Sequence, residues 1–234
     1  MKLTVKKKRT GRIPFSAQEI RRILAPETYL KWTSDFKHRH NPSHNVGIFP
    51  TYPSDTKNQL CYYWIFLLGI HSGLRTNEMC QLRLSDLKKQ KGIWFMHVED
   101  DEESKVKTIN SIRKVPVHPQ LMKLGFIDYI GNLKRKKDRV FWELTKSRDG
   151  YTKQVSRHYN ERFLPAIKIW KKNVKVLYCT RHTFINKLYS EKVDENVIKV
   201  LVGHEKEFTM KHYDGEPVSY THLRAHETRH DLVC

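Results

Sequence analysis

Five side chains in this sequence could together act on a phosphate group. Arg75, Lys107, Arg181 and His204 supply cations or hydrogen-bond donors, and Tyr213 supplies a hydroxyl. Arginine forks match the non-bridging oxygens of a phosphodiester, and fixed cations stabilise the extra charge of its pentacoordinate transition state. A tyrosine can attack phosphorus when its phenolate is stabilised, and a lysine can protonate the departing alkoxide. The order of these residues therefore predicts phosphodiester chemistry.

We expect this chemistry to need no metal and no cofactor, because no group of carboxylates suited to Mg²⁺ lies near these residues in the sequence. A histidine-rich segment with His38, His40 and His44 could instead hold zinc. No cysteine or carboxylate joins these histidines at ligand spacing, and the cysteines form no C-x-x-C pair. A zinc-dependent nucleic-acid binder is therefore kept as one alternative interpretation.

The charge of the chain indicates a polyanionic partner. Its 234 residues contain 44 Lys and Arg against 25 Asp and Glu, a formal net charge of +19. Such an excess repels itself unless a polyanion neutralises it, so nucleic acid is the expected partner. A basic protein that is merely soluble, or one drawn to an anionic membrane surface, is the alternative. No apolar run is long enough to span a membrane, and the cysteines are typical of reduced thiols, so we expect a cytoplasmic protein.

Two predicted helices position Arg75. Residues 56–70 are apolar nearly all round, which predicts a buried central helix. A turn at Gly73 leads into a second helix over residues 76–84, and Glu78 lies one turn beyond Arg75. An arginine at a helix start is usually a surface charge, but Glu78 could hold this one in place.

Strand-like composition at residues 92–100, 105–108 and 112–117 predicts a small antiparallel sheet, with Lys107 beside its last turn. Together with the helices, this gives an α+β fold class: mainly α-helical with a small antiparallel β-sheet.

Helical periods and capping residues predict the remaining helices, which lie at residues 16–24, 120–130, 154–170, 181–191, 194–201 and 208–213. Ser16 and Glu19 form a capping box for the first of these. Asp194 and Gly203 are suited to begin and end the helix that precedes His204. These short helices bring Arg181, His204 and Tyr213 into one part of the chain.

These elements form one predicted domain at residues 13–217, preceded by a basic arm at residues 1–12 and followed by a tail at residues 218–234. The arm is expected either to be solvated or to track phosphates. The tail has no apolar period and repeats a His-Arg theme, so we expect it to be non-native and outside the fold.

Several motifs, in this order, resemble those of the tyrosine recombinases, or phage integrases. The run H-S-G-L-R-T-N-E-M resembles the first box of that family, which implies a catalytic arginine at Arg75. The run V-K-T-I-N-S-I-R-K-V-P-V resembles the hairpin that carries its catalytic lysine, here Lys107. The runs T-R-H-T-F and L-V-G-H resemble the second box and its histidine motif, which implies Arg181 and His204. Tyr213 follows nine residues later as the implied nucleophile.

The sequence departs from the family pattern at Tyr178, three residues before Arg181, where the family usually has histidine or lysine. A tyrosine at this position can hydrogen-bond the phosphate, but its ordinary pKa of about 10 makes it a poor base at neutral pH. Removal of the proton from the nucleophile would then depend on water or on His204.

The resemblance covers the catalytic domain of the family and implies cleavage and rejoining of double-stranded DNA through a 3′-phosphotyrosine link. It implies that Arg75, Arg181 and His204 bind the phosphate and that Lys107 protonates the 5′-oxygen. It also implies a monomer that assembles into a homotetramer on paired DNA sites, encoded by a bacterium, phage or mobile element and associated with the nucleoid. Two alternatives share this fold: a type IB topoisomerase-like enzyme that religates the same strand, and a DNA-binding module that has lost catalysis.

Overall fold

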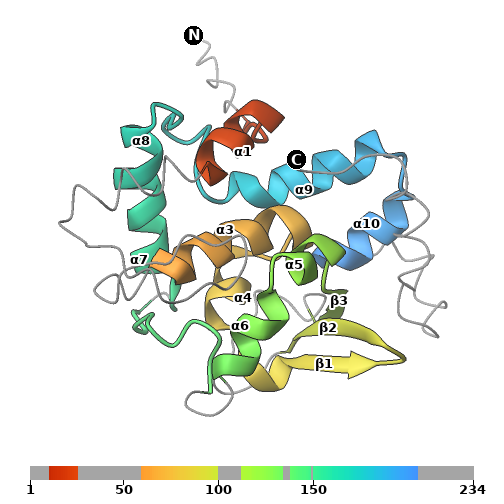
Figure 1. Cartoon of the computed structure of the whole chain (residues 1–234). Coiled ribbons are helices and arrows are strands. Elements are labelled where there is room, and N and C mark those ends of the chain that lie inside the picture. The colour runs from red at the N-terminus through yellow and green to blue at the C-terminus, as the bar shows by residue number, and fades with distance from the viewer. Residues whose placement is uncertain (1–10, 26–58, 100–111, 134–137, 149, 205–234) are drawn as a thin grey trace, which may run out of the picture.

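Helices surround one central helix, and a small sheet lies at one side of the molecule (Figure 1). The computed structural model describes residues 11–25, 59–99, 112–133, 138–148 and 150–204. Its helices are α1 (Ala17–Leu24), α3 (Gln59–Ser72), α4 (Thr76–Gln81), the 3₁₀ turn η1 (Leu84–Asp86), α5 (Pro119–Lys123), α6 (Phe126–Leu133), α7 (Thr152–Arg157), the π-helix η3 (His158–Phe163), α8 (Leu164–Ala166), α9 (Cys179–Ser190) and α10 (Glu195–Val202). Its strands are β1 (Leu87–Gln90), β2 (Ile93–Val98) and β3 (Arg113–Pro116). The predicted fold class, mainly α-helical with a small antiparallel β-sheet, is confirmed.

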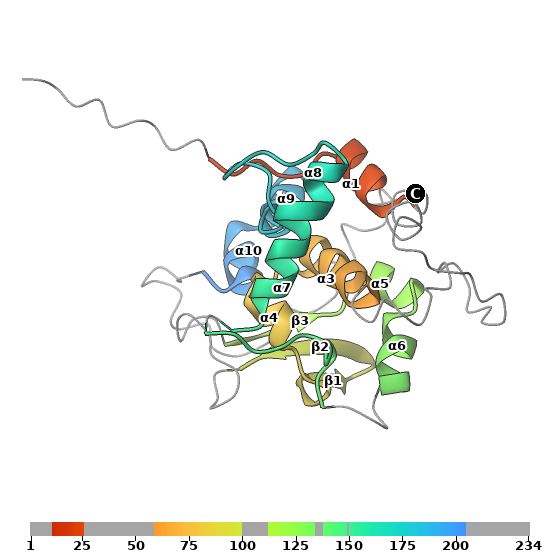
Figure 2. The ribbon, with the colours of Figure 1, turned by 90° about the vertical axis from the view of Figure 1, so that its left-hand side faces the viewer.

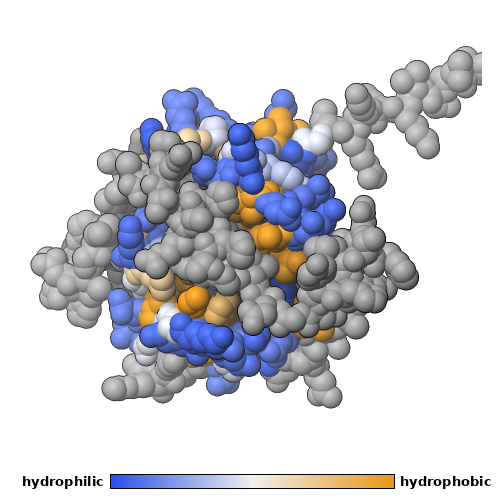
Figure 3. Space-filling model, turned by 90° about the vertical axis from the view of Figure 1, so that its right-hand side faces the viewer, coloured by the Kyte–Doolittle hydropathy of each residue, from blue (hydrophilic) through white to orange (hydrophobic). Residues whose placement is uncertain are grey.

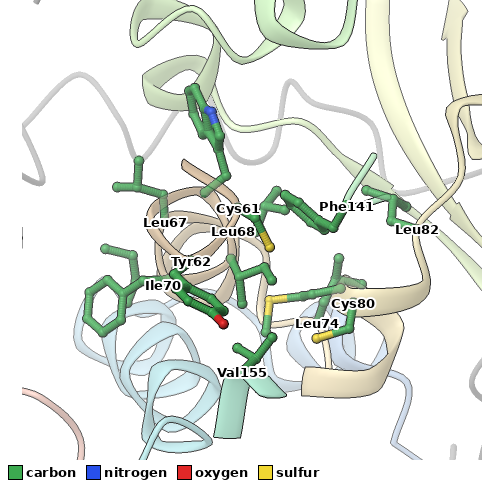
Figure 4. Close-up of a cluster of buried hydrophobic side chains, with 14 of the residues drawn as sticks. Cys61, Tyr62, Leu67, Leu68, Ile70, Leu74, Cys80, Leu82, Phe141 and Val155 are labelled. Carbon is green, nitrogen blue, oxygen red and sulfur yellow. The ribbon is translucent and has the colours of Figure 1, made fainter. Parts of the chain in front are cut away.

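The central helix is α3, as its all-round apolar character predicts. Trp64, Phe66 and Leu68 are almost fully buried, and each such side chain stabilises the fold by roughly 1.5–3 kcal/mol. The close-up in Figure 4 shows side chains of α3 packed toward those of α4 and toward Phe141 and Val155. The prediction of a buried helix is confirmed for its described part, and the helix continues to Ser72.

Helix α9 crosses α3 at close range because α3 has a glycine at the crossing. A Cβ atom on Gly69 would lie 2.4 Å from Oγ1 of Thr180, so only glycine leaves room for this approach. Gly73, at the end of α3, adopts φ of +64° and lies against the ring of Phe184 in the same way. The close crossing brings the segment around Arg75 next to the segment around Arg181.

The sheet differs from the predicted one in its strands. Its order is β1-β2-β3 with antiparallel pairs throughout. We did not predict β1, although Lys91 and Gly92, both at positive φ, form the kind of two-residue turn that joins hairpin strands. The predicted strand at residues 112–117 is confirmed as β3, and its partner is β2. The candidate strand at residues 105–108 lies outside the described residues.

Two predicted helices prove to be interrupted. The helix predicted at residues 120–130 is split into α5 and α6, because Gly125 between them has φ of +84°. The helix predicted at residues 154–170 contains the π-helix η3 and ends at Ala166. It stops there because Lys168 adopts φ of +57°, a left-handed conformation that no α-helix continues.

Helices α9 and α10 agree with the predicted segments and bury a second, smaller cluster, formed by Phe184, Leu188, Val193, Ile198, Leu201 and Val202. Asp194 caps α10 by accepting hydrogen bonds from the N–H groups of Asn196 and Val197, as expected from the sequence. Gly203 ends it with φ of +65°. On the right-hand face of the molecule, hydrophobic side chains show among hydrophilic ones (Figure 3).

The segment ahead of α1 is bound to the domain along α9 (Figure 2). The N–H of Ile13 donates to the carbonyl of Val174 at 3.0 Å, and the N–H of Phe15 donates to Oγ1 of Thr183 at 2.8 Å. The capping box of α1 is confirmed: the N–H of Ser16 donates to Glu19 at 2.7 Å. The predicted tail at residues 218–234 and the predicted short helix at residues 208–213 lie outside the described residues.

Candidate active site

Arg75 lies at the corner between α3 and α4. Its Nη1 donates to Oε1 of Glu78 at 2.8 Å, and its backbone N–H donates to Oε2 at 2.7 Å. Its Nη2 donates to the carbonyl of Gly203 at 2.9 Å. The prediction that Glu78 holds Arg75 is confirmed. The side chain of Arg75 remains 19% exposed, so it can still meet a ligand.

Arg181 lies on α9 and is only 2% exposed. Its Nη1 donates to the carbonyl of Gly73 at 2.6 Å, and its Nη2 donates to the carbonyl of Val202 at 2.5 Å. Burial lowers the pKa of Arg181 to about 10, and the charge of Arg75 acts in the same direction, against the effect of Tyr178. The guanidinium therefore keeps its charge at neutral pH.

A third arginine, Arg113 on β3, joins this cluster although sequence reasoning missed it. Its Nη2 and Nη1 donate to the two carboxylate oxygens of Glu78 at 2.9 and 3.2 Å, and its Nε donates to the carbonyl of Leu201 at 2.7 Å. The signal was the two-residue period of the strand, which puts Arg113 on the same buried face as Val115, while Lys114 is exposed.

Glu78 is the carboxylate that ties Arg75 to Arg113. Burial alone would raise the pKa of Glu78, but hydrogen bonds from Arg113 and Arg75 and the charge of Arg113 hold it below its ordinary value. Glu78 is therefore ionised at neutral pH. Below, "arginine cluster" means Arg75, Arg113 and Arg181 together with Glu78.

The arginine cluster is attached to the end of α10. Three successive carbonyls, of Leu201, Val202 and Gly203, accept hydrogen bonds from Arg113, Arg181 and Arg75 in turn. These carbonyls form the negative end of the helix, where cations are stabilising. Elements from three distant parts of the sequence thus converge on one helix terminus.

His204 follows directly and lies at the surface beside the cluster. Its N–H donates to the carbonyl of Lys199 at 3.0 Å, which together with Gly203 closes the helix. Partial burial lowers the pKa of His204, and the charges of Arg181 and Arg75 lower it further. His204 is therefore neutral at neutral pH and able to donate or accept one hydrogen bond.

Tyr178 lies at the N-terminus of α9, one turn before Arg181. The guanidinium carbon of Arg12 lies 4.4 Å from the centre of the Tyr178 ring, and the ring of His182 packs edge-on against it at 5.5 Å. Burial lowers the pKa of His182, followed by the charges of Arg12 and Arg181. The structure therefore brings Arg75, Arg181, His204 and Tyr178 to one region, as their order in the sequence predicted.

Lys107 and Tyr213, the predicted general acid and nucleophile, lie outside the described residues, as do His38, His40 and His44. Among the residues that the structure describes, no three His, Cys, Asp or Glu side chains form a group that could hold a metal ion. No helix in the described ranges is long and apolar enough to cross a membrane.

Solved structures with a similar fold include site-specific recombinases. The XerH recombinase bound to its difH substrate matches with a TM-score of 0.53 at 14% identity, covering 84% of this chain and 48% of the other. The Tn1549 transposon integrase, in complex with transposon right end DNA, matches with a TM-score of 0.50 at 17% identity, covering 97% and 68%. The chain thus spans about half the length of XerH. The fold is that of the catalytic domains of tyrosine recombinases.

The amino-acid sequence assigns the chain to a family. A model of the Phage integrase family matches residues 48–219, which is well over half of the chain. No curated protein sequence matches it. The chain belongs to the phage integrase family.

Proposed function

We propose that this chain is a site-specific DNA recombinase or integrase. It cleaves and rejoins DNA strands through a 3′-phosphotyrosine intermediate at Tyr213, without a metal ion. Family membership and the DNA complexes of XerH and the Tn1549 integrase support DNA as the substrate. The net charge of +19 fits a polyanion.

The observation that carries this proposal is the convergence of three arginines at the end of α10. Arg75, Arg113 and Arg181 bring three positive charges into one largely buried region, where hydrogen bonds to Glu78 and to the carbonyls that end α10 fix their geometry. Cations held in a fixed geometry bind a phosphodiester well, and they would stabilise the further charge of its transition state.

The remaining residues complete the chemistry. The Tyr213 oxygen attacks phosphorus and forms the phosphotyrosine bond as the bond from phosphorus to the 5′-oxygen breaks. Lys107 transfers a proton to that oxygen, which leaves as a hydroxyl. His204, neutral at this pH, accepts the tyrosine proton directly or through water, and Tyr178 hydrogen-bonds the phosphate. Attack by the 5′-hydroxyl of a partner strand reverses these steps and exchanges strands, in a homotetramer on paired sites.

Trapping the covalent intermediate tests the proposal. The protein is incubated, with EDTA present, with nicked suicide duplexes that carry the candidate attachment sequences flanking its gene. We expect a covalent adduct on denaturing gels that Tyr213→Phe abolishes. Tyr189→Phe is the matched control, because Tyr189 is half exposed on α9 and loses the same hydroxyl. An adduct that survives in Tyr213→Phe, or that forms only with added Mg²⁺, overturns the mechanism.

One observation favours a second candidate, a DNA-binding protein of this fold with impaired catalysis. Arg181 is 2% exposed and its guanidinium bonds to the backbone carbonyls of Gly73 and Val202. In that case the duplexes bind but no adduct forms. A topoisomerase-like enzyme instead forms the adduct, relaxes supercoiled plasmid and never joins two duplexes in a synapsis assay.

A further inference from the structure

The contact between Arg12 and Tyr178 joins the start of the described chain to the candidate active site. The guanidinium carbon of Arg12 lies 4.4 Å from the ring centre, well within the range of a cation–π interaction. The two residues are 166 positions apart in the sequence, so the contact depends on how residues 11–16 are bound to the domain.

Several hydrogen bonds fix that segment. Ile13 pairs with Val174 through the backbone, and the N–H of Phe15 donates to Thr183 on α9. The Nζ of Lys175 donates to the carbonyl of Pro14 at 2.7 Å and also forms an ion pair with Glu19 of α1. Phe15 is only 4% exposed. Arg12 therefore directly precedes an anchored segment, which places its backbone beside Tyr178.

The electrostatics of this place favour a bound anion. Arg12 adds a positive charge at the N-terminus of α9, which is already the positive end of that helix. Its charge also reaches the site, because Arg12 and Arg181 both lower the pKa of His182. An anion bound nearby would therefore interact favourably with Arg12 as well as with the helix end.

We infer that Arg12 is a positioning residue of the active site: it stacks on Tyr178 and holds the hydroxyl of that residue toward the DNA phosphate beside Arg181. This inference rests on the proposed function and deepens it. Tyr178 stands one turn before Arg181 on α9 and cannot carry a positive charge of its own. Arg12 supplies the charge from a different segment, while Tyr178 supplies the hydrogen bond.

A double-mutant cycle with single-turnover measurement of the covalent adduct tests the pairing. We expect Arg12→Ala to slow adduct formation about fivefold, the size of an exposed cation–π contact. We expect Arg12→Lys to restore most of that loss. Tyr178→Phe, which keeps the ring, should also slow the reaction, and Arg12→Ala should then add less than about a threefold loss, because Arg12 acts through the hydroxyl.

Arg22→Ala is the matched control, because Arg22 is exposed on α1 and the same charge is lost. It should leave the adduct rate unchanged and should weaken DNA binding as slightly as Arg12→Ala does. Multiplicative losses for Arg12→Ala and Tyr178→Phe, or an equal loss in Arg22→Ala, overturn the inference.

A measurement on the free protein separates this inference from the proposed function. NMR titration of His182 without DNA should show a higher pKa in Arg12→Ala than in the wild type, because a neighbouring positive charge has been removed. Arg22→Ala should leave that pKa in place. An unchanged His182 pKa in Arg12→Ala refutes the contact, whether or not the protein forms a DNA adduct. A raised pKa with no adduct in the wild type refutes the recombinase proposal and leaves the contact standing.

Discussion

The arginine cluster and the corner around Tyr178 are built on different principles. In the cluster, hydrogen bonds from guanidinium groups to Glu78 and to the carbonyls that end α10 fix every arginine. At the Tyr178 corner, the contacts that hold the ring are those of the Arg12 guanidinium and the His182 ring, in a partly exposed setting. One half of the site belongs to the core, and the other half lies at the rim.

This difference separates two tasks. Binding a phosphate needs cations in a fixed geometry, and burial with full hydrogen bonding holds them there before the substrate arrives. At the Tyr178 corner, the proposed task is one hydrogen bond to the phosphate, which tolerates looser packing than a buried ion pair does. We therefore expect variants of the cluster to damage both stability and chemistry, and variants of the corner to damage chemistry alone.

The largest effect should come from Arg181→Lys. A lysine keeps the charge but cannot hold the carbonyls of Gly73 and Val202 with a planar fork. We expect adduct formation to fall about 100- to 1000-fold, while DNA affinity in a filter-binding titration falls less than about tenfold. Arg157→Lys, at an exposed position on α7, is the control and should match the wild type. Equal losses of affinity and rate would mean that Arg181 is purely structural.

Glu78→Gln should have the next largest effect, this time on stability. It removes the charge that pairs with both Arg75 and Arg113, and breaking a buried pair costs about 3–5 kcal/mol. Urea denaturation should show a free energy of unfolding lower by about 3 kcal/mol. Glu99→Gln is the control, because the side chain of Glu99 is 48% exposed. A Glu78→Gln protein as stable as the control would show that the cluster does not support the fold.

Acid should weaken the core. Burial lowers the pKa of both His71 and His158 to about 3, and His118 beside His71 lowers that of His71 further. The two imidazoles bind protons near pH 6.5 in the unfolded chain but only near pH 3 in the folded protein. They therefore leave the free energy of unfolding unchanged above pH 6.5 and lower it as the pH falls from 6.5 toward 3.

At pH 5, each of these two histidines is expected to lower the free energy of unfolding by about 2 kcal/mol. Urea denaturation at pH 7.5 and pH 5.0 measures this loss, and His158→Gln should reduce it by about 2 kcal/mol. A free energy of unfolding that stays constant between the two pH values contradicts the assignment of neutral, buried imidazoles.

The parts of the site that local sequence determines could be predicted. Arg75 with Glu78, and Asp194 with Gly203, each depend on residues within one or two turns, where capping and helical spacing act. Arg113 could not be found in that way, because its carboxylate partner lies 35 residues away and its burial is a property of the folded sheet. The order of the motifs identified the region of the site, and tertiary structure decided which arginines share it.

The attachment of α10 to the arginines also has a thermodynamic consequence. The guanidinium groups that would receive a phosphate are the same groups that hold the carbonyls of Leu201, Val202 and Gly203. Occupancy of the phosphate site and the position of this helix end are therefore linked. The linkage is reciprocal: a ligand that binds preferentially to one position of α10 changes phosphate affinity by the same factor as phosphate changes the affinity for that ligand. Because Tyr213 follows α10 in the sequence, a phosphate bound at the cluster would be coupled to the proposed nucleophile through the end of this helix.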